Sequence, residues 1–332
     1  MITRRLFTLS ATSSLCSPAV GRLFAQTAPG AAIAGSAAAL EQLHSVSVLV
    51  GGETVVSEAF RGPPLGRPAP IKSVSKSLVA LCLGAAIDRG VISGVDATLG
   101  EVAQDLIPQG ADARVAKITM ADLVTMQAGL ERTSGANYGE WVASRDWVAN
   151  ALSRPFVAEP GRGMLYSTGS FHVLGAALSV ASGKSLLSMM QEWIGTPLDV
   201  DFPAWTRDPQ GYYLGGNEMA LRPADLLKIG GMMIRNDGTV LSKEWIEVSY
   251  IPRTRSRWSG LGYGYGWFLG RADGANFALG RGYGGQILCL VPERQTVIAI
   301  TSDPTRPARS GGYFSDLMQL ISRDILPALR SA

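Results

Sequence analysis

Residues 73–87 read SVSKSLVALCLGAAI, a predicted helix that is apolar nearly all round except for Lys76 in its first turn. A cation at a helix N-terminus opposes the helix dipole, and a helix that is apolar on every side is normally buried. Stability therefore disfavours Lys76 on both counts. A chemical role is the better explanation for a lysine at this position.

Ser73 and Lys76 lie three residues apart, so a helix brings the hydroxyl and the amine onto one face. The helix dipole and burial both favour the neutral amine, which is a base. A base beside a serine hydroxyl activates it as a nucleophile, and Ser-Lys is a known form of this pairing. Ser73 at the start of the helix also offers its backbone N–H to a developing oxyanion. The alternative is a capping serine followed by a lysine that extends to solvent, and the motif alone does not decide between the two.

The chain contains two histidines, His44 and His172, and both lie in apolar stretches. This argues against a Ser-His-Asp triad and against a zinc site, which needs several His or Cys ligands at short spacing. The sequence also lacks a G-x-S-x-G turn and a G-x-x-x-x-G-K-[ST] phosphate loop. We therefore expect no metal and no cofactor, with lysine and tyrosine carrying the proton transfer.

The N-terminus reads MITRRLFTL and continues with small and apolar residues to about Ala28, with no acidic residue before Glu41. A paired-arginine segment followed by an apolar stretch is typical of a twin-Arg export signal. We interpret residues 1–28 as this signal and expect a periplasmic or secreted mature protein. Removal of the signal takes away three arginines and no acid, so the formal charge changes from +3 to 0. We expect no nucleic-acid partner for such a chain.

The composition, with 332 residues of which 46% are hydrophobic and 17% charged, is typical of a compact globular protein. The mature sequence has no stretch long and apolar enough to span a bilayer, so we expect no stable membrane insertion after signal removal. Cys16 falls in the signal, whereas Cys82 and Cys289 have apolar neighbours, which favours two buried thiols over a disulfide without deciding the matter. The sequence gives no indication of the oligomeric state.

Strand patterns occur at both ends of the chain and helix patterns between them. Residues 44–50 and 53–60 predict a β-hairpin. Helices are predicted at 73–89, 120–127, 140–153, 169–182, 186–194, 223–235, 243–249 and 313–329, and further strands at 264–270, 276–280, 286–291 and 296–301. We predict an α+β fold in which residues 36–72 and 250–332 build one antiparallel sheet flanked by helices, with a mainly helical region, 73–249, inserted. Ser73 then lies in the cleft between the two regions of a single catalytic unit.

Three motifs, in this order, resemble those of the serine β-lactamase and penicillin-binding-protein superfamily. They are SVSKS at 73–77, PGRGMLYST at 160–168 and GRGYGGQ at 280–286, with supporting stretches at 118–130 and 221–230. The resemblance spans about residues 44–328 and is greatest to the class C β-lactamase-like branch, with its related esterases and 6-aminohexanoate-dimer hydrolases. Ordered motifs are more specific than any one of them. The resemblance implies a β-lactamase/transpeptidase-like fold.

Carried onto this sequence, the resemblance implies that Ser73 is the acylated nucleophile and Lys76 its base partner. It implies that Tyr166 shares proton transfer with the lysine from across the cleft, which is reasonable for a phenol beside an ammonium. The third motif implies a second oxyanion N–H from the backbone at Gly282 or Tyr283. The alternative for Tyr166 is a half-buried aromatic side chain on a loop.

Two positions depart from the family pattern. Thr168 stands where Asn is common, which removes an amide that could orient the lysine or hold the substrate. The first position of the third motif holds neither lysine nor histidine, and Arg281 lies close to it. The loss of that cation weakens the case for a carboxylate-bearing β-lactam as substrate. Thr168, Arg281 and Tyr212 are interpreted as candidate substrate-binding residues.

The leading hypothesis is an exported serine hydrolase that acts through an acyl-enzyme on a small ester or amide. A true β-lactamase or a D-alanyl-peptide hydrolase is an alternative that differs in substrate. A non-catalytic module that binds peptidoglycan fragments is a second alternative, which the altered positions leave open. The intact set of Ser73, Lys76 and Tyr166 argues against that module, because a buried amine costs stability and a site without chemistry does not need one.

Overall fold

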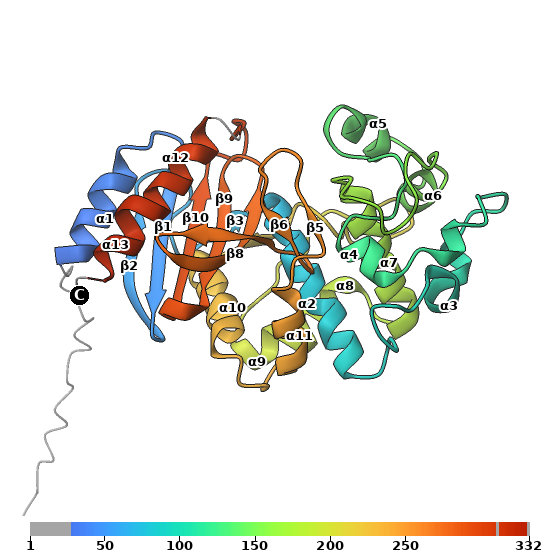
Figure 1. The fold of residues 1–332 in the computed structure, drawn as a ribbon, viewed down its shortest axis with the longest axis horizontal. Helices are drawn as coiled ribbons and strands as arrows, with labels where there is room; N and C mark the ends of the chain where they lie inside the picture. Colours follow the sequence, from blue (N-terminus) through green and yellow to red (C-terminus); the bar gives the residue numbers. More distant parts are fainter. Residues whose placement is uncertain (1–27, 310–311, 331–332) are drawn as a thin grey trace, which may run out of the picture.

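The computed structural model describes residues 28–309 and 312–330. The predicted export signal lies outside these residues except for Ala28, where the first helix begins. An antiparallel sheet forms the centre of the fold, in the strand order β2-β1-β10-β9-β8-β7-β6-β5 (Figure 1). Both ends of the chain contribute to it, because β1 (Leu43–Val50) pairs with β10 (Thr296–Ser302). The predicted α+β fold with one antiparallel sheet is confirmed.

Tight turns join most neighbouring strands of the sheet. The predicted hairpin of β1 and β2 turns at Gly51 and Gly52, which adopt φ values of 57° and 91° that glycine reaches without steric cost. The remaining strands are β2 (Glu53–Ala59), β5 (Thr254–Arg255), β6 (Gly262–Tyr263), β7 (Phe268–Ala272), β8 (Ala275–Gly282) and β9 (Gln286–Val291). Two further short strands, β3 (Ala69–Pro70) and β4 (Ala220–Leu221), pair with each other beside the turn Lys72–Val74. This turn carries Ser73, the predicted nucleophile, and is called the nucleophile turn below.

Helices cover the sheet on two sides (Figure 1). The terminal helices pack together on one side: α1 (Ala28–Ala38), and α12 (Tyr313–Gln319), which continues through a wide turn, Leu320–Ile325, into α13 (Leu326–Ala328). On the other side α10 (Pro223–Arg235) packs on β1, β9 and β10. Gly230 permits this close approach, because a Cβ there would clash with the side chain of Val297.

The inserted region is mainly helical, and the larger part of it lies beside the β5 end of the sheet, whereas its helices α9 and α11 lie next to α10 (Figure 1). Its helices are α2 (Ser75–Asp88), α3 (Leu99–Ala103), α4 (Met120–Val124), α5 (Tyr138–Val142), α6 (Trp147–Leu152), α7 (Thr168–Ser182), α8 (Leu186–Met190), α9 (Thr196–Leu198) and α11 (Lys243–Ser249). The helix predicted at 140–153 was wrong as a single element. It is two helices, because Asp146 accepts a hydrogen bond from the Ala149 N–H and starts α6 there.

A second boundary also differs from the prediction. The strand predicted at 264–270 begins only at Phe268, since residues 264–267 form a turn in which Gly266 has a φ of 83°. Gly266 also lies against α2, because a Cβ there would approach the Cβ of Ala80 to 2.5 Å. The turn therefore carries the chain past the nucleophile helix before the strand resumes.

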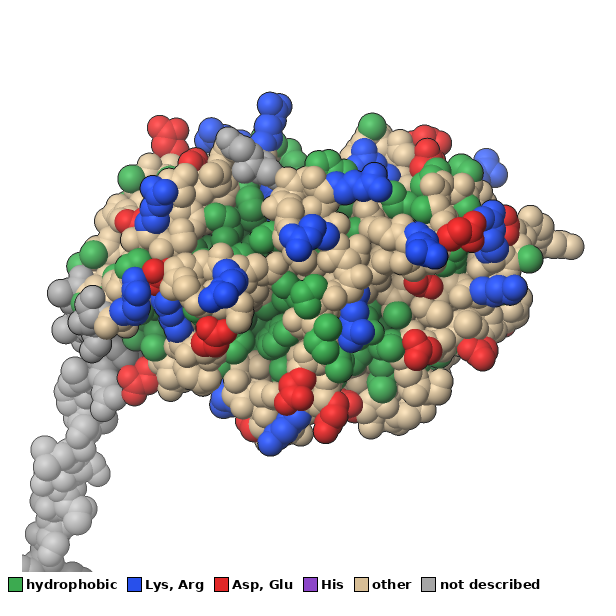
Figure 2. Space-filling model, viewed as in Figure 1, with side chains coloured by type: hydrophobic (Ala, Val, Ile, Leu, Met, Phe, Trp, Pro, Cys, Tyr) green, Lys and Arg blue, Asp and Glu red, His purple; other side chains and the backbone are tan. Residues whose placement is uncertain are grey.

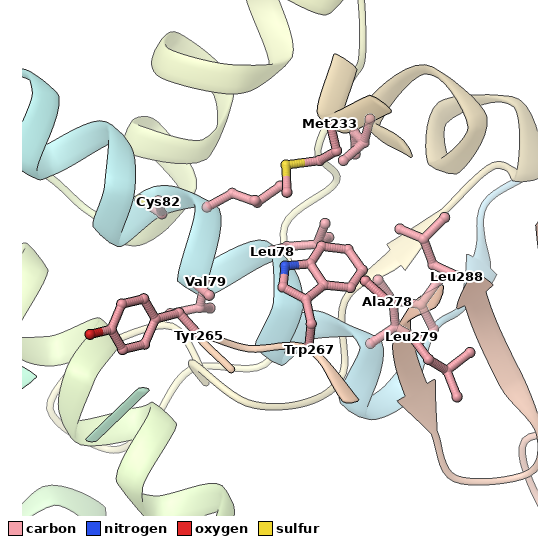
Figure 3. Close-up of a cluster of buried hydrophobic side chains, with 14 of the residues drawn as sticks. Leu78, Val79, Cys82, Met233, Tyr265, Trp267, Ala278, Leu279 and Leu288 are labelled. Atoms are coloured by element: carbon pink, nitrogen blue, oxygen red, sulfur yellow. The ribbon is translucent and has the colours of Figure 1, made fainter. Parts of the chain in front are cut away.

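Helix α2 packs between the sheet and the inserted helices, as its all-round apolar sequence predicts. Figure 3 shows Leu78 and Val79 of α2 beside Trp267 and Leu279, all of them buried.

The described cysteines, Cys82 in α2 and Cys289 in β9, are both free and buried, and burial raises the pKa of each thiol to about 12. Within the described residues, no single helix is long and apolar enough to cross a bilayer, and one pair bent by 81°, α7 with the segment Leu186–Leu198, meets the length and composition criteria together.

Candidate active site

Ser73 lies in a 3-10 turn, Lys72–Val74, that leads directly into α2. The helix predicted to begin at Ser73 therefore begins at Ser75, and Ser73 sits just before its first turn. The turn is held in place by the short β3–β4 pair, whose strand β3 ends at Pro70. Lys72, the residue before the nucleophile, has a φ of 49°, which a side chain other than glycine rarely adopts.

Lys76 is almost fully buried, with 2% of its surface exposed. Its Nζ lies 3.1 Å from the Ser73 Oγ, as the three-residue spacing predicts. Burial lowers the pKa of Lys76 below its ordinary value, and the Tyr166 phenol, by charge and by a hydrogen bond, opposes this shift in part. The net direction favours the neutral amine, which is the form that can accept the Ser73 proton.

The other partners of Lys76 orient its amine. Nζ lies 2.7 Å from the carbonyl oxygen of Gly216 and 3.2 Å from the Oγ1 of Thr168. A carbonyl can only accept, so one N–H of Lys76 points to Gly216. If the Thr168 hydroxyl donates a hydrogen bond to the Ser134 Oγ, 3.0 Å away, the Thr168 oxygen accepts the second N–H of Lys76. That arrangement leaves the lone pair of a neutral amine directed at Ser73.

Tyr166 approaches Lys76 from the loop that precedes α7. The centre of its ring lies 5.0 Å from the Lys76 Nζ, and the phenol is near enough to act against the lowering of the Lys76 pKa. Tyr166 and Ser73 both line the same cleft. The structure therefore brings together the three side chains to which the sequence assigned the chemistry.

The third motif lies on β8 and packs against the nucleophile turn. A Cβ at Gly282 would clash with the carbonyl oxygen of Ile71 and lie 3.1 Å from the Lys72 Cβ. A Cβ at Gly280 would lie 3.0 Å from the Ser77 Oγ, so this position has little room for the lysine or histidine common in the family. Gly282 lines the cleft, and the next residue, Tyr283, lines it too with 53% of its surface exposed.

Arg281 lines the cleft as well. Its guanidinium lies 3.4 Å from the centre of the Phe314 ring, and it donates a hydrogen bond to the Ala308 carbonyl. Burial lowers the pKa of Arg281 from its usual value, but a guanidinium stays charged at physiological pH. The cleft is therefore bordered by a fixed cation on the sheet side.

The cleft has a volume of about 580 Å³. Its wall combines polar groups near Ser73 with aromatic and apolar side chains farther out. The lining residues are Lys72, Ser73, Ser134, Gly135, Tyr138, Tyr166, Thr168, Asn217, Glu218, Ser256, Trp258, Phe268, Arg281, Gly282, Tyr283, Pro304 and Ala308. This composition is typical of a small-molecule site.

One predicted site residue lies elsewhere. Tyr212 borders a separate surface hollow with Ser179 and Lys184, and it does not line the cleft of Ser73. Its backbone N–H donates to the Oδ1 of Asp208, which fixes the loop before Tyr213. Aromatic composition alone suggested Tyr212, and the fold turns its segment away from the nucleophile.

Among the cleft residues that were not predicted, four make contacts that shape the site. Ser134 accepts the Thr168 N–H at 2.8 Å, and Trp258 stands exposed at the rim with the Arg132 guanidinium 5.4 Å from its ring. Lys72 and Glu218 form an ion pair of 3.1 Å beside Ser73. Lys72 adjoins the motif in sequence and could have been noticed there, whereas the others have no local signal.

Neither histidine contributes to the cleft. His172 is fully buried, and its Nε2 lies 2.9 Å from the Asp208 Oδ2, with Trp141 and Trp147 packed on its ring. Across the described residues, no group of three or more His, Cys, Asp or Glu side chains is placed to hold a metal ion. The chemistry that this cleft supports is nucleophilic attack by Ser73 with proton transfer through Lys76 and Tyr166.

The Beta-lactamase family model matches residues 21–320 of the chain. The match covers most of the sequence and includes the Ser73, Tyr166 and Gly282 motifs. The chain therefore belongs to the Beta-lactamase family. No match is found among the curated proteins.

Solved structures of low sequence identity share the fold. The octameric penicillin-binding protein homologue from Pyrococcus abyssi matches with a TM-score of 0.70 and 19% identity, over 88% of this chain and 76% of that chain. A putative 6-aminohexanoate-dimer hydrolase from Bacillus anthracis matches with a TM-score of 0.71 and 17% identity, over 87% and 79%. EstCE1, a hydrolase with promiscuous acyltransferase activity, matches with a TM-score of 0.71 and 17% identity, over 88% and 97%. The β-lactamase/transpeptidase-like fold implied by the sequence is confirmed, and hydrolases are among its structural neighbours.

Proposed function

We propose that this protein is an exported serine hydrolase that cleaves a small ester or amide through an acyl-enzyme. The observation that carries the proposal is the buried Lys76 amine, with its lowered pKa, 3.1 Å from the Ser73 Oγ. A buried lysine that neighbours a serine hydroxyl is a base positioned for that hydroxyl. The hydrolase neighbours support the same class of reaction.

Acylation begins when the Ser73 Oγ attacks the substrate carbonyl and its proton passes to the Lys76 Nζ. The backbone N–H groups of Ser73 and Tyr283 stabilise the oxyanion of the tetrahedral intermediate. When the carbonyl re-forms, the bond to the leaving group breaks, and that group takes a proton from the Lys76–Tyr166 pair. The Ser73 ester and the free alcohol or amine are the products of this half-reaction.

Deacylation repeats the same proton movements with water as the nucleophile. Lys76 and Tyr166 take a proton from the water as it attacks the Ser73 ester. The tetrahedral intermediate then collapses, the proton returns to the Ser73 Oγ, and the carboxylic acid leaves. The cycle needs no metal or cofactor.

The size and wall of the cleft support a small-molecule substrate with an apolar portion. Trp258, Phe268, Tyr138 and Tyr283 supply aromatic surface around about 580 Å³. On the face drawn in Figure 2, Lys and Arg side chains are spread over the surface, with Asp and Glu side chains elsewhere on the same face, and do not form one continuous basic stripe, which accords with a partner other than nucleic acid. The paired arginines Arg4 and Arg5 support export to the periplasm or the medium.

A fluorophosphonate probe tests the nucleophile without knowledge of the substrate. We expect intact-mass analysis of the protein to give one adduct per chain, peptide mapping to place it on Ser73, and Ser73→Ala to remain unlabelled. Ser179→Ala is the matched control, since Ser179 lies outside the cleft and donates to the Gly175 carbonyl. An unlabelled wild-type protein would contradict the proposal and favour a binding module. Turnover of a chromogenic cephalosporin would assign the substrate to the β-lactams.

A further inference from the structure

Two charged residues beside Ser73 occupy backbone conformations that favour glycine. Lys72 has a φ of 49° and Glu218 a φ of 67°, and their side chains form an ion pair of 3.1 Å. A residue other than glycine rarely adopts this conformation, and such strain gathers at functional sites. Glycine would relieve the strain at either position, whereas this chain has a charged residue at both.

The pair lies on the wall of the cleft and is open to it. The Lys72 side chain is 20% exposed and the Glu218 side chain 34% exposed, and both residues line the cleft with Ser73. A partly solvated pair of this kind is worth little to stability. A substrate group can therefore reach either charge without breaking a buried interaction.

The balance of charge in the cleft is positive. Among the described residues that line it, Lys72 and Arg281 are cations and Glu218 is the only carboxylate. A third cation, Arg132, stands at the rim against the Trp258 ring. An anion entering the cleft meets net attraction, whereas a cation is attracted by Glu218 alone.

We propose that Lys72 determines specificity by binding a carboxylate on the substrate, and that Glu218 holds the Lys72 ammonium in place until the substrate arrives. This inference rests on the proposed hydrolase function and names the substrate class as anionic esters or amides. The substrate carboxylate takes the place of Glu218 as the partner of Lys72, and the released Glu218 side chain turns to solvent. Arg281 adds to the attraction from the β8 side of the cleft.

Two matched pairs of aryl esters test the inference. The acyl pair is the nitrophenyl half-ester of glutarate against nitrophenyl butyrate, which differ by a terminal carboxylate. A second pair carries the carboxylate on the leaving group, as the butyrates of 4-hydroxybenzoate and phenol. The measurement is the ratio of kcat/KM for the anionic ester to that for the neutral one. The wild-type ratio should exceed one in at least one pair and fall as salt is added.

Variants of the pair should move this ratio in opposite directions. Lys72→Met should lower it by about tenfold, the usual effect of losing one charge-assisted hydrogen bond, and Lys72→Arg should restore most of it. Glu218→Gln should raise it, because it removes the competitor for Lys72. Lys184→Met and Glu192→Gln are matched controls, since this Lys–Glu pair lies on the surface outside the cleft and should leave the ratio unchanged.

The outcomes separate the two proposals. Hydrolysis that does not depend on Ser73 would contradict the proposed function itself. A second outcome would overturn the anion inference alone. Hydrolysis would depend on Ser73, but the kcat/KM ratio would be about one in both pairs and would not change with salt or in Lys72→Met. Preference for a cationic ester, such as the 4-(trimethylammonio)butyrate, that is lost in Glu218→Gln would also overturn this inference.

Discussion

The Lys76 Nζ lies closer to the carbonyl oxygen of Gly216, at 2.7 Å, than to the Oγ of Ser73, at 3.1 Å. The base is therefore oriented by a backbone group 140 positions away in sequence. The close approach of the loop at Gly215 and Gly216 to α7 and Lys76 depends on both glycines. A Cβ at Gly215 would clash with the Phe171 carbonyl, and one at Gly216 would lie 3.2 Å from the Lys76 Nζ. The orientation of the amine is set by the packing of this loop on α7.

The burial of Lys76 predicts opposite effects of Lys76→Met on activity and on stability. Loss of the base should lower kcat by roughly 10²- to 10⁴-fold. The buried methionine should raise the free energy of unfolding at neutral pH, because burial lowers the pKa of the lysine and the unfolded chain binds its proton more tightly. Initial rates and urea denaturation of the two proteins provide the measurements.

The pH dependence gives a control for this prediction. Between the lowered pKa of the native state and the ordinary lysine value of 10.5, the unfolded state binds more protons, so wild-type stability rises with pH. The stability advantage of Lys76→Met should therefore shrink as the pH rises toward 10.5. Wild-type kcat/KM should fall as the pH drops through the lowered pKa. A stability difference that stays constant with pH would refute the role assigned to burial.

Thr168 is expected to position the Lys76 amine through its hydroxyl. Thr168→Val keeps the shape and removes the oxygen that lies 3.2 Å from Lys76 and 3.0 Å from Ser134. We expect kcat to fall by about tenfold, with a smaller change in KM, because one hydrogen bond to the base is lost. Thr168→Ser retains the hydroxyl and should keep most of the activity. Equal rates for the valine and serine variants would contradict this role, because retention of the hydroxyl would then give no advantage.

The motif residues could be placed from sequence because their spacing is local. Ser73 and Lys76 are one helical turn apart, and the apolar run after them predicts the buried helix that carries both. The strand patterns at both ends of the chain likewise predicted the sheet. If these strands pair with each other, the helices that lie between them in sequence form an insertion. Tyr166 required the family resemblance, because nothing local distinguishes it from another loop tyrosine.

The remainder of the site depends on contacts that are distant in sequence. The Gly216 carbonyl has no sequence signal as an acceptor, and Ser134 reaches Thr168 only through the packing of its loop on α7. Tyr212 was selected for its composition, and the turn around Asp208 directs its segment to another surface. The departure at Gly280 has a physical reason that the sequence could not give, namely the close approach of Ser77.

Gly282 is expected to be sensitive to a single added methyl group. In Gly282→Ala the Cβ would clash with the Ile71 carbonyl and lie 2.9 Å from the Gln286 Cβ, so β8 must move away from the nucleophile turn. We expect a loss of activity of at least tenfold, because oxyanion donors act only at short range. Gly94→Ala is the control, since no atom lies within 4 Å of its Cβ position. Full activity in Gly282→Ala would place the second oxyanion donor elsewhere.

The buried pair of His172 and Asp208 is expected to stabilise the fold without taking part in the chemistry. Asp208 Oδ2 bonds the His172 Nε2, and its Oδ1 accepts the backbone N–H groups of Gln210 and Tyr212. Asp208→Ala leaves these three groups without their acceptor, and the His172 ring among them is fully buried, which should cost about 3 kcal/mol or more. Asp208→Asn keeps an oxygen for the loop and should cost less. Urea denaturation measures both.

The location of the pair defines what would contradict this assignment. Neither residue lines the cleft of Ser73, so the fraction of Asp208→Ala that remains folded should label with the fluorophosphonate probe at the wild-type rate. Glu192→Ala provides the control, because Glu192 also pairs with a cation, Lys184, but is 54% exposed, and its loss should leave the free energy of unfolding nearly unchanged. A folded Asp208→Ala protein with slow labelling would mean that the loss of Asp208 displaces α7 around His172 and so moves Thr168 at the start of the same helix. In that case the pair would position the site as well as stabilise the fold.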